Sequence, residues 1–274
     1  MDRNSAAFVG SIPELYDRGL GPVIFADFAE QMAERVAATS PEIVLETAAG
    51  TGIVTQALRR RLPEATRIIA TDLNPPMLEI ARSKPGLDRQ VTLQTADAQN
   101  LPFDDGTFDA VICQFGLMFF PDKLHSFGEA LRVLKPGGHY HFSVWDAHRY
   151  NGFARIVDGL VRETFPVDPP AFYAVPFSCA AIDPLKAMVL DAGFADLRIS
   201  VVTLDKIVDD LEPFSRGLIF GNPLIDQIRA RNGPSPEAMQ AKLLALLQAE
   251  FGSGPAIMPL QTIFYRASKP VALF

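Results

Sequence analysis

Val44-Leu45-Glu46-Thr47-Ala48-Ala49-Gly50-Thr51-Gly52-Ile53-Val54-Thr55 joins an apolar run to a helical pattern through an acid, small residues and two glycines. About twenty residues later a second apolar run, Arg67–Thr71, ends in Asp72. Glycines let backbone approach a ligand closely because they carry no Cβ. A carboxylate after the second run can accept both hydrogen bonds of a ribose diol. Together the segments predict a nucleotide-binding slot at the edge of a parallel sheet.

The details of the glycine segment favour S-adenosylmethionine (SAM) over other nucleotides. Dinucleotide sites usually have a third glycine, and Thr55 stands at that place. Glu46 precedes the glycines, where its charge would repel a pyrophosphate but would favour the amino group and sulfonium of SAM. No Gly-Lys-Ser/Thr follows the turn, which excludes a phosphate-binding loop. An NAD-linked dehydrogenase remains an alternative.

Five motifs in order between residues 40 and 146 resemble those of class I SAM-dependent methyltransferases. Glu46–Gly52 resembles the first motif, with Ala48 in place of its first glycine. The set is most similar to the UbiE/Methyltransf_11 group of small-molecule methyltransferases. The other four motifs are Asp72-Leu73-Asn74-Pro75-Pro76-Met77-Leu78, Asp97-Ala98, Phe108–Gln114 and Leu131–Gly138.

This resemblance implies SAM as the cofactor and a particular set of binding residues. It also implies a seven-stranded sheet that is mostly parallel, with one antiparallel strand inserted at its edge. Asp72 would bind the ribose, although Asp also caps helices, and Asp97 would lie at the adenine. The implied cofactor-binding residues are Glu46, Ala48, Gly50, Thr51, Gly52, Asp72, Leu73, Met77, Asp97, Ala98 and Gln114.

Alternating strand and helix patterns independently predict a doubly wound, Rossmann-like α/β fold with a helical cap. We expect one domain over residues 1–274: N-terminal helices at 11–39, a cofactor-binding core at 40–146, a cap at 147–180 and a C-terminal part at 181–274. Strands are expected near 42–47, 67–71, 91–94, 108–114, 138–145, 197–204 and 259–268. Helices are expected near 52–62, 75–83, 122–134, 151–164, 184–192 (capped by Asp183), 209–219 and 235–250.

Bulk composition sets further limits. A net charge of −7 argues against a nucleic-acid substrate, and no apolar run is long enough to cross a membrane. The two cysteines offer no disulfide framework, so a cytoplasmic setting is expected. No cluster has metal-ligand spacing, so no metal is expected. The sequence leaves the oligomeric state open.

Aromatic residues beyond the strand ends are candidates for an apolar acceptor pocket, although most aromatics belong to cores. His148, which follows the fifth predicted strand, is a weak candidate for a general base. His139 and His141 share one face of that strand and are weaker candidates still. The candidate pocket residues are Phe115, Phe119, Tyr150, Phe172, Tyr173 and Phe177.

The sequence therefore predicts methyl transfer from SAM to a small, partly apolar molecule, mainly by positioning and desolvation. Whether oxygen, nitrogen or carbon accepts the methyl is left open. Two further alternatives remain: a transferase that uses another SAM derivative, and a regulator that binds SAM or its demethylated product without catalysis.

Overall fold

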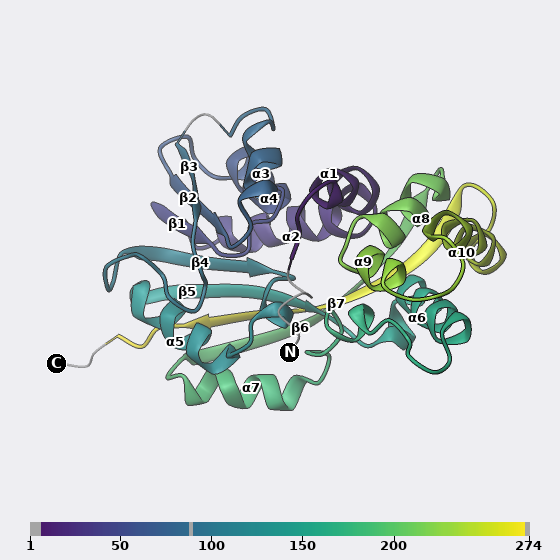
Figure 1. The fold of residues 1–274 in the computed structure, drawn as a ribbon. Coiled ribbons are helices and arrows are strands. Elements are labelled where there is room, and N and C mark those ends of the chain that lie inside the picture. Colours follow the sequence, from purple (N-terminus) through teal and green to yellow (C-terminus); the bar gives the residue numbers. More distant parts are fainter. Residues whose placement is uncertain (1–6, 88–89, 272–274) are drawn as a thin grey trace.

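A single seven-stranded sheet organises the computed structural model, which describes residues 7–87 and 90–271 (Figure 1). The strand order is β3-β2-β1-β4-β5-β7-β6. Strands β1 to β5 are parallel, and β7 runs antiparallel to both of its neighbours. The mixed sheet expected from the resemblance is confirmed. The strands are β1 Ile43–Glu46, β2 Arg67–Asp72, β3 Val91–Thr95, β4 Phe108–Gln114, β5 Leu134–Trp145, β6 Ala195–Val208 and β7 Ala256–Ser268.

The strand order reverses between β1 and β4. From β1 the chain winds outward through β2 and β3, and it then returns to place β4 on the other side of β1. In open α/β sheets ligands bind outside the carboxyl ends of the strands at such a reversal. The topology therefore places a ligand site beside Glu46 and Gln114, the last residues of β1 and β4.

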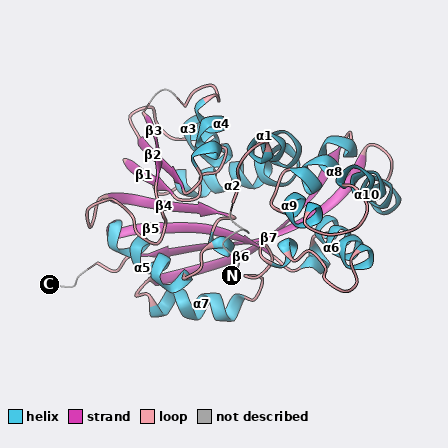
Figure 2. Cartoon of the chain, viewed as in Figure 1, coloured by secondary structure: helices cyan, strands magenta, loops and turns pink. Residues whose placement is uncertain are grey.

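Helices cover both faces of the sheet (Figure 2). Helices α2 and α3 pack together over one face, while α5 and α7 pack together over the other. The longer helices are α2 Ala26–Ala37, α3 Ile53–Arg61, α4 Pro75–Arg82, α5 Lys123–Val133, α6 Gly152–Thr164, α7 Ile182–Asp191, α8 Leu211–Phe220 and α10 Pro236–Phe251. The shorter segments are α1 Ile12–Leu15, α9 Leu224–Arg229 and the 3₁₀ turns η3 Leu117–Phe119, η4 His148–Tyr150 and η5 Phe172–Ala174.

The N-terminal helical region predicted over residues 11–39 is formed, but its middle is not α-helical. Residues Tyr16–Phe25 (η2) form a π-helix that contains Pro22, which lacks a backbone N–H. In α2 the side chains of Phe28, Met32 and Val36 are fully buried, as their helical spacing predicts. Segment η2 ends at Phe25 and continues directly into α2, the helix that covers the sheet.

The C-terminal half differs in three details from the sequence prediction. Strands β6 and β7 are longer than predicted, because they form one antiparallel pair, joined through α8, α9 and α10, that extends past the parallel strands (Figure 1). Helix α7 begins at Ile182 with Ala181 at its N-cap, so the prediction that Asp183 caps a helix starting at Pro184 was wrong. Helix α9 was not predicted, because six residues are too few to show a hydrophobic period.

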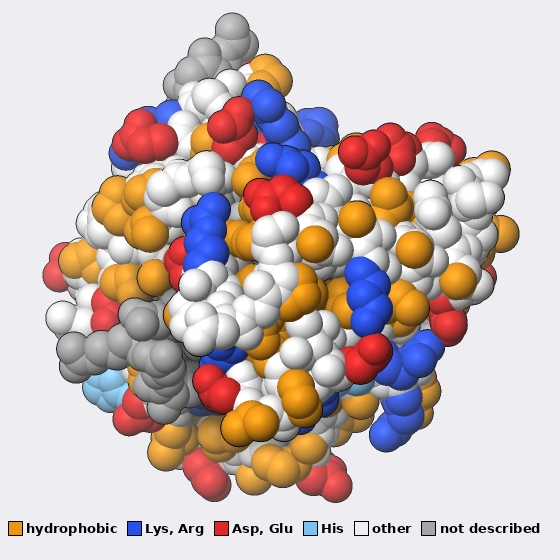
Figure 3. Space-filling model, turned by 45° about the vertical axis from the view of Figure 1, so that its right-hand side comes forward, with side chains coloured by type: hydrophobic (Ala, Val, Ile, Leu, Met, Phe, Trp, Pro, Cys, Tyr) orange, Lys and Arg blue, Asp and Glu red, His pale blue; other side chains and the backbone are white. Residues whose placement is uncertain are grey.

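Figure 3 shows basic and acidic side chains interspersed on one face of the molecule, without a continuous basic area on that face. Within residues 7–87 and 90–271, no helix is long and apolar enough to span a bilayer. The same residues contain no group of three or more His, Cys, Asp or Glu side chains arranged to hold a metal ion.

Candidate functional site

The turn after β1 has a left-handed backbone at three alternate residues. The φ angle is +52° at Ala48, +57° at Gly50 and +78° at Gly52. A Cβ on Gly52 would lie 2.9 Å from the Cβ of Ala81, so glycine is needed there for α3 to start against α4. A Cβ on Gly50 would meet only Met77 Cε, at 3.5 Å, within the described chain. Gly50 therefore leaves open space on the side of the turn that faces Met77.

Asp72 connects the end of β2 to this turn. Its Oδ2 accepts a hydrogen bond from the Gly50 backbone N–H (2.8 Å), and its Oδ1 accepts one from the Asn74 backbone N–H (2.8 Å). Asn74 Nδ2 also donates to Oδ1, at 3.3 Å. Burial raises the pKa of the Asp72 carboxyl, although these hydrogen bonds oppose the shift. Asn74 occupies the N-cap position of α4, so Asp72 is not the helix cap.

Glu46 is buried beneath the turn. The Thr55 hydroxyl donates a hydrogen bond to Glu46 Oε2, at 2.6 Å. Burial raises the pKa of Glu46 to about 8, and the nearby Asp72 carboxylate adds to the rise. Glu46 is therefore mostly protonated at neutral pH and connects β1 to α3.

Asp17 of segment η2 also contacts the turn. Its Oδ1 accepts a hydrogen bond from the Thr51 hydroxyl (2.6 Å) and forms an ion pair with Lys84 Nζ (2.6 Å). Both partners of this ion pair are largely shielded from solvent, with side-chain exposures of 15% for Lys84 and 22% for Asp17. The contacts hold η2 against the glycine turn.

The turn, the end of β2 and the loop after β3 enclose a concave slot with an open volume of about 760 Å³. Its walls combine backbone, carboxylates and apolar side chains. Gln114 Oε1 is buried at this site without a hydrogen-bond partner in the described chain. Eight of the predicted cofactor-binding residues line the slot: Ala48, Gly50, Asp72, Leu73, Met77, Asp97, Ala98 and Gln114.

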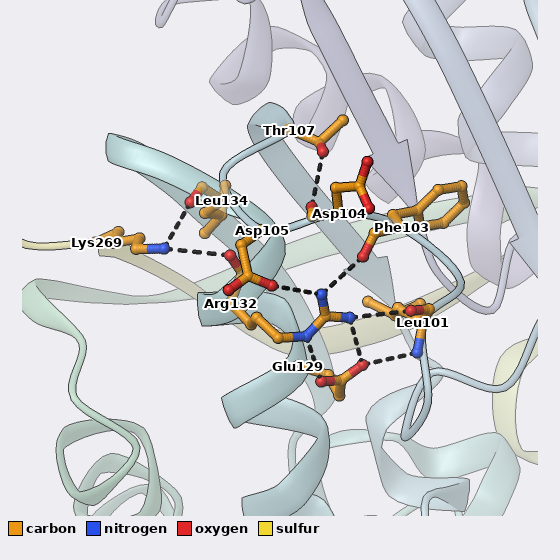
Figure 4. A network of polar contacts seen from close by, with 9 residues as sticks. All are labelled: Leu101, Phe103, Asp104, Asp105, Thr107, Glu129, Arg132, Leu134 and Lys269. Carbon is orange, nitrogen blue, oxygen red and sulfur yellow. Dashed lines mark hydrogen bonds and ion pairs between the residues drawn. The ribbon is translucent and has the colours of Figure 1, made fainter.

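Asp97 lies in the slot wall formed by the loop after β3. Its Oδ1 accepts a hydrogen bond from the Gln99 backbone N–H, at 2.8 Å. Farther along, Arg132 of α5 donates to the backbone oxygens of Leu101 (2.9 Å) and Phe103 (2.7 Å), while Glu129 accepts from Leu101 N–H (Figure 4). This network ties the loop to α5 and so supports the position of Asp97.

A second hollow of about 500 Å³, which includes space open to solvent, adjoins the slot; we name it the aromatic chamber. In its lining Phe115 stacks on Trp145, with ring centroids 4.1 Å apart and planes at 8°. No described residue that lines the chamber is Asp, Glu, His, Lys or Arg. Its lining is Phe8, Tyr16, Leu20, Ile24, Phe25, Phe115, Met118, Phe119, Trp145, Phe153, Phe172, Tyr173, Pro176, Phe177, Leu218 and Asn222.

Four aromatic residues belong to both cavities: Phe8, Tyr16, Phe115 and Phe119. Phe8 packs edge-on against Tyr16 and Phe119, with ring centroids 5.7 and 5.9 Å apart. Burial, with Asp72 and Asp17 nearby, raises the pKa of Tyr16 and keeps its hydroxyl protonated. The polar slot and the apolar chamber thus share one wall.

Comparison with known proteins agrees with this geometry. The methyltransferase domain family Methyltransf_25 matches residues 44–138. A demethylmenaquinone methyltransferase from Thermus thermophilus is 35% identical over 181 residues, which cover 60% of this chain and 79% of that protein. The chain belongs to the class I SAM-dependent methyltransferases. SAM is therefore its cofactor.

Two further comparisons show how much of the chain is similar to known proteins. A demethylmenaquinone methyltransferase from Deinococcus radiodurans is 36% identical over 126 residues, 46% of this chain and about half (52%) of that relative. The solved YcgJ protein from Bacillus subtilis superposes with a TM-score of 0.59 at 19% identity, covering 90% of this chain and all of that one. The second likeness supports the methyltransferase fold alone.

Several predicted site residues of this methyltransferase lie outside both cavities. Glu46, Thr51 and Gly52 do not line the slot. Glu46 hydrogen-bonds to Thr55 and Thr51 to Asp17, while Gly52 faces Ala81, which leaves no room for a Cβ there. Tyr150 does not line the chamber either; it is 40% exposed and its ring stacks under the Arg149 guanidinium. The other predicted pocket residues, Phe115, Phe119, Phe172, Tyr173 and Phe177, all line the chamber.

Neither His148 nor His141 lines the slot or the chamber. His148 packs against Phe177 (ring centroids 4.4 Å apart), and its Nε2 lies 3.2 Å from the Tyr173 backbone oxygen, behind the chamber wall. Burial lowers the pKa of His141 to about 3, so its ring is neutral. His141 lines a separate surface hollow with Arg35 and Arg266, which places it outside both cavities.

Sequence patterns missed most of the residues that line the chamber, and three of these, Phe8, Tyr16 and Asn222, carry polar groups or belong to the shared wall. Phe8 and Tyr16 come from the N-terminal segment, and Asn222 follows α8. None lies in a motif of the methyltransferase family quoted above. The only signal for Tyr16 was an aromatic residue next to an acid, Asp17, within a helical pattern. Their places in the walls of the two cavities depend on the tertiary structure.

Proposed function

We propose that this protein transfers a methyl group from SAM to a small, neutral, largely aromatic molecule bound in the aromatic chamber. The observation that carries the proposal is the shared wall: a nucleotide-shaped slot adjoins an apolar cavity through Phe8, Tyr16, Phe115 and Phe119. A cofactor in the slot and an acceptor in the chamber would meet at this wall.

The slot residues fit SAM. Gly50 leaves room for backbone approach, and Leu73, Met77 and Ala98 offer apolar surface for an adenine ring. A carboxylate has about four acceptor positions. At Asp72, donors of the described residues occupy three of them. We assign a ribose hydroxyl to the free position on Oδ2 and a second to Oδ1, where it would displace the long contact from Asn74 Nδ2. Gln114 Oε1 is an acceptor for a further donor of the cofactor.

Glu46 acts on the turn and not through direct contact with the cofactor. Its hydrogen bond with Thr55 ties β1 to α3 across the glycine segment. A protonated Glu46 places no net charge under the turn. Thr51 has an indirect role too, because its hydroxyl donates to Asp17 and so holds segment η2, with Tyr16, over the slot.

The chamber residues position the acceptor and exclude water. The sulfonium of SAM supplies an activated methyl, so alignment and desolvation account for most of what the protein must add. No described lining residue is Asp, Glu, His, Lys or Arg, and burial raises the pKa of Tyr16 and Tyr173 so that both hydroxyls stay protonated; no lining side chain therefore takes a proton from the acceptor. The acceptor therefore needs a nucleophilic atom of its own. His148 lies behind Tyr173 and Phe177, so we do not assign it the role of a base.

The relatives support a ring-shaped acceptor. Those from Thermus thermophilus and Deinococcus radiodurans are named demethylmenaquinone methyltransferases. A flat ring of that kind suits a chamber whose walls include the stacked rings of Phe115 and Trp145.

Ligand binding followed by product analysis tests the proposed function. Calorimetry should detect binding of SAM and of its demethylated product but not of NAD. At about a hundred times its dissociation constant, each should stabilise the fold by roughly 2.7 kcal/mol. Methyl-labelled SAM should then label one member of a panel of ring compounds, identified by mass spectrometry. Stabilisation by NAD alone would indicate a dehydrogenase, and tight SAM binding without labelling of any acceptor would indicate a non-catalytic binding protein.

A further inference from the structure

Tyr173 of η5 and Asn222 after α8 form a buried polar end of the aromatic chamber, whose lining also includes the polar side chains Tyr16 and Trp145. Tyr173 and Asn222 are almost inaccessible, with exposures of 4% and 2%. Neither lines the cofactor slot. Phe153, Phe177 and Leu218 likewise line the chamber but not the slot, so the Tyr173–Asn222 pair lies within apolar surface.

Internal hydrogen bonds fix which groups this polar end can offer. The Tyr173 hydroxyl donates to the Leu218 backbone oxygen (3.2 Å), and it accepts from Asn222 Nδ2 (3.4 Å). Asn222 Nδ2 also donates to the same Leu218 oxygen (3.0 Å), and Asn222 Oδ1 accepts from the Leu224 N–H (3.0 Å). Both amide hydrogens and the single hydroxyl hydrogen are thus used. What remains on Tyr173 is one acceptor lone pair.

We infer that the acceptor molecule carries a hydrogen-bond donor, a hydroxyl or an N–H, that binds Tyr173 Oη, and that Tyr173 and Asn222 select neutral donor-bearing rings over ethers and carboxylates. An ether oxygen placed against Tyr173 would meet a lone pair and gain no hydrogen bond from Tyr173 or Asn222. A carboxylate would be buried without a cation, because no described lining residue is charged. Asn222 is a positioning residue that fixes the direction of the Tyr173 hydroxyl. The inference rests on the proposed function only in treating the chamber as the acceptor site.

Binding can be measured without turnover, because Trp145 is the only tryptophan of the chain and lines the chamber. Quenching of its fluorescence at neutral pH reports the affinity of three probes: para-propylphenol, its methyl ether para-propylanisole, and para-propylbenzoate. We expect the phenol to bind about tenfold more tightly than the ether, a typical value for one neutral hydrogen bond. The benzoate should bind more weakly than either. Equal affinity for phenol and ether, or tightest binding of the benzoate, would overturn the inference.

Two variants locate the effect. Tyr173→Phe should bring the affinity for the phenol down to that for the ether, whereas Tyr150→Phe, altered at an exposed tyrosine outside the chamber, should keep the tenfold preference. A preference that survives Tyr173→Phe in a protein with an unchanged melting temperature would overturn the assignment. In the unaltered protein, para-propylaniline provides an N–H donor and tests the same point if Tyr173→Phe does not fold. It should bind like the phenol, and affinity no higher than that of the ether would count against the inference.

The test separates this inference from the proposed function. Probe selectivity is a property of the chamber and is measured without cofactor. Failure of SAM to bind would overturn the proposed methyl transfer while the phenol preference stood. Loss of the preference with intact SAM binding would overturn only the role of Tyr173 and Asn222.

Discussion

Asp72 Oδ2 lies 2.8 Å from the backbone nitrogen of Gly50 and accepts its hydrogen. The carboxylate that ends β2 therefore holds the turn that follows β1. A residue expected only to contact a ribose also shapes the slot into which that ribose would fit.

Replacement of Asp72 should lower both stability and cofactor affinity. Asp72→Ala leaves the Gly50 and Asn74 N–H groups without their acceptor, which should cost about 1–3 kcal/mol of unfolding free energy. Affinity for SAM and its product should fall by roughly one to three powers of ten. Asp72→Asn should be milder because one oxygen remains. Calorimetry and thermal melts on the same samples check both, and normal SAM affinity in a destabilised Asp72→Ala protein would end the ribose assignment.

Gly50 should tolerate no side chain that fills the slot. Gly50→Ala requires a left-handed alanine, which costs about 1–2 kcal/mol, but its Cβ would meet only Met77 Cε, at 3.5 Å. Gly50→Val adds two methyl groups on the same side and should abolish SAM binding. The alanine variant is the matched control for backbone strain. Similar SAM affinity in the two variants, measured by calorimetry, would show that the cofactor does not approach this residue.

Ala48 and Gly116 should be coupled. A Cβ on Gly116 would lie 2.4 Å from Ala48 Cβ and 2.9 Å from Cys113 Sγ, so Gly116→Ala should cost about 1–3 kcal/mol. Ala48→Gly removes one of these overlaps and also relieves the left-handed alanine. The double variant should therefore be more stable than Gly116→Ala alone. Denaturant unfolding of the four proteins checks this, and strictly additive free energies would contradict it.

The pKa of Glu46 predicts a pH dependence of stability. Its folded pKa, about 8, lies above the ordinary value of 4.5 because the group is buried. The stability that the protonated form contributes is complete below pH 4.5 and is lost as pH rises through about 8. Glu46→Gln stays neutral and keeps an acceptor for Thr55. Its melting temperature relative to the unaltered protein should therefore rise across that range, and a constant difference would exclude a raised pKa.

Phe177 should influence the acceptor site without altering the cofactor slot. An alanine there risks a loss of about 3–5 kcal/mol, so Phe177→Leu is the more informative change. It removes ring contacts with Trp145 and Phe153, which should weaken binding of para-propylphenol about three- to tenfold. Affinity for the demethylated cofactor should stay the same. Tyr150→Leu serves as the exposed control, and equal effects of both changes on phenol binding would remove Phe177 from the chamber.

The succession of strands along the chain and the position of the cofactor turn were predictable from local signals. Each parallel strand is a short apolar run bounded by turn residues, and the glycines and Asp72 mark the strand ends at which a ligand binds. The length of the antiparallel β6–β7 pair was less predictable, because edge strand β6 alternates half-buried and exposed residues and extends beyond its most apolar part. The start of α7 was misplaced for a similar reason: Pro184 is common at a helix start but is also tolerated anywhere in the first turn.

The sequence by itself determined the α/β order, the SAM family and most of the slot, because these depend on residues that are close along the chain and on periodic burial. Only the tertiary structure decided where the aromatic chamber, the proposed acceptor site, lies. Its walls come from Phe8, Trp145, Tyr173 and Asn222, which share no motif and no period. It also decided that Glu46 and Thr51 support the turn from behind. Which side chains face one cavity depends on how distant segments pack, and a buried carboxyl and a ligand-binding one look the same in a sequence.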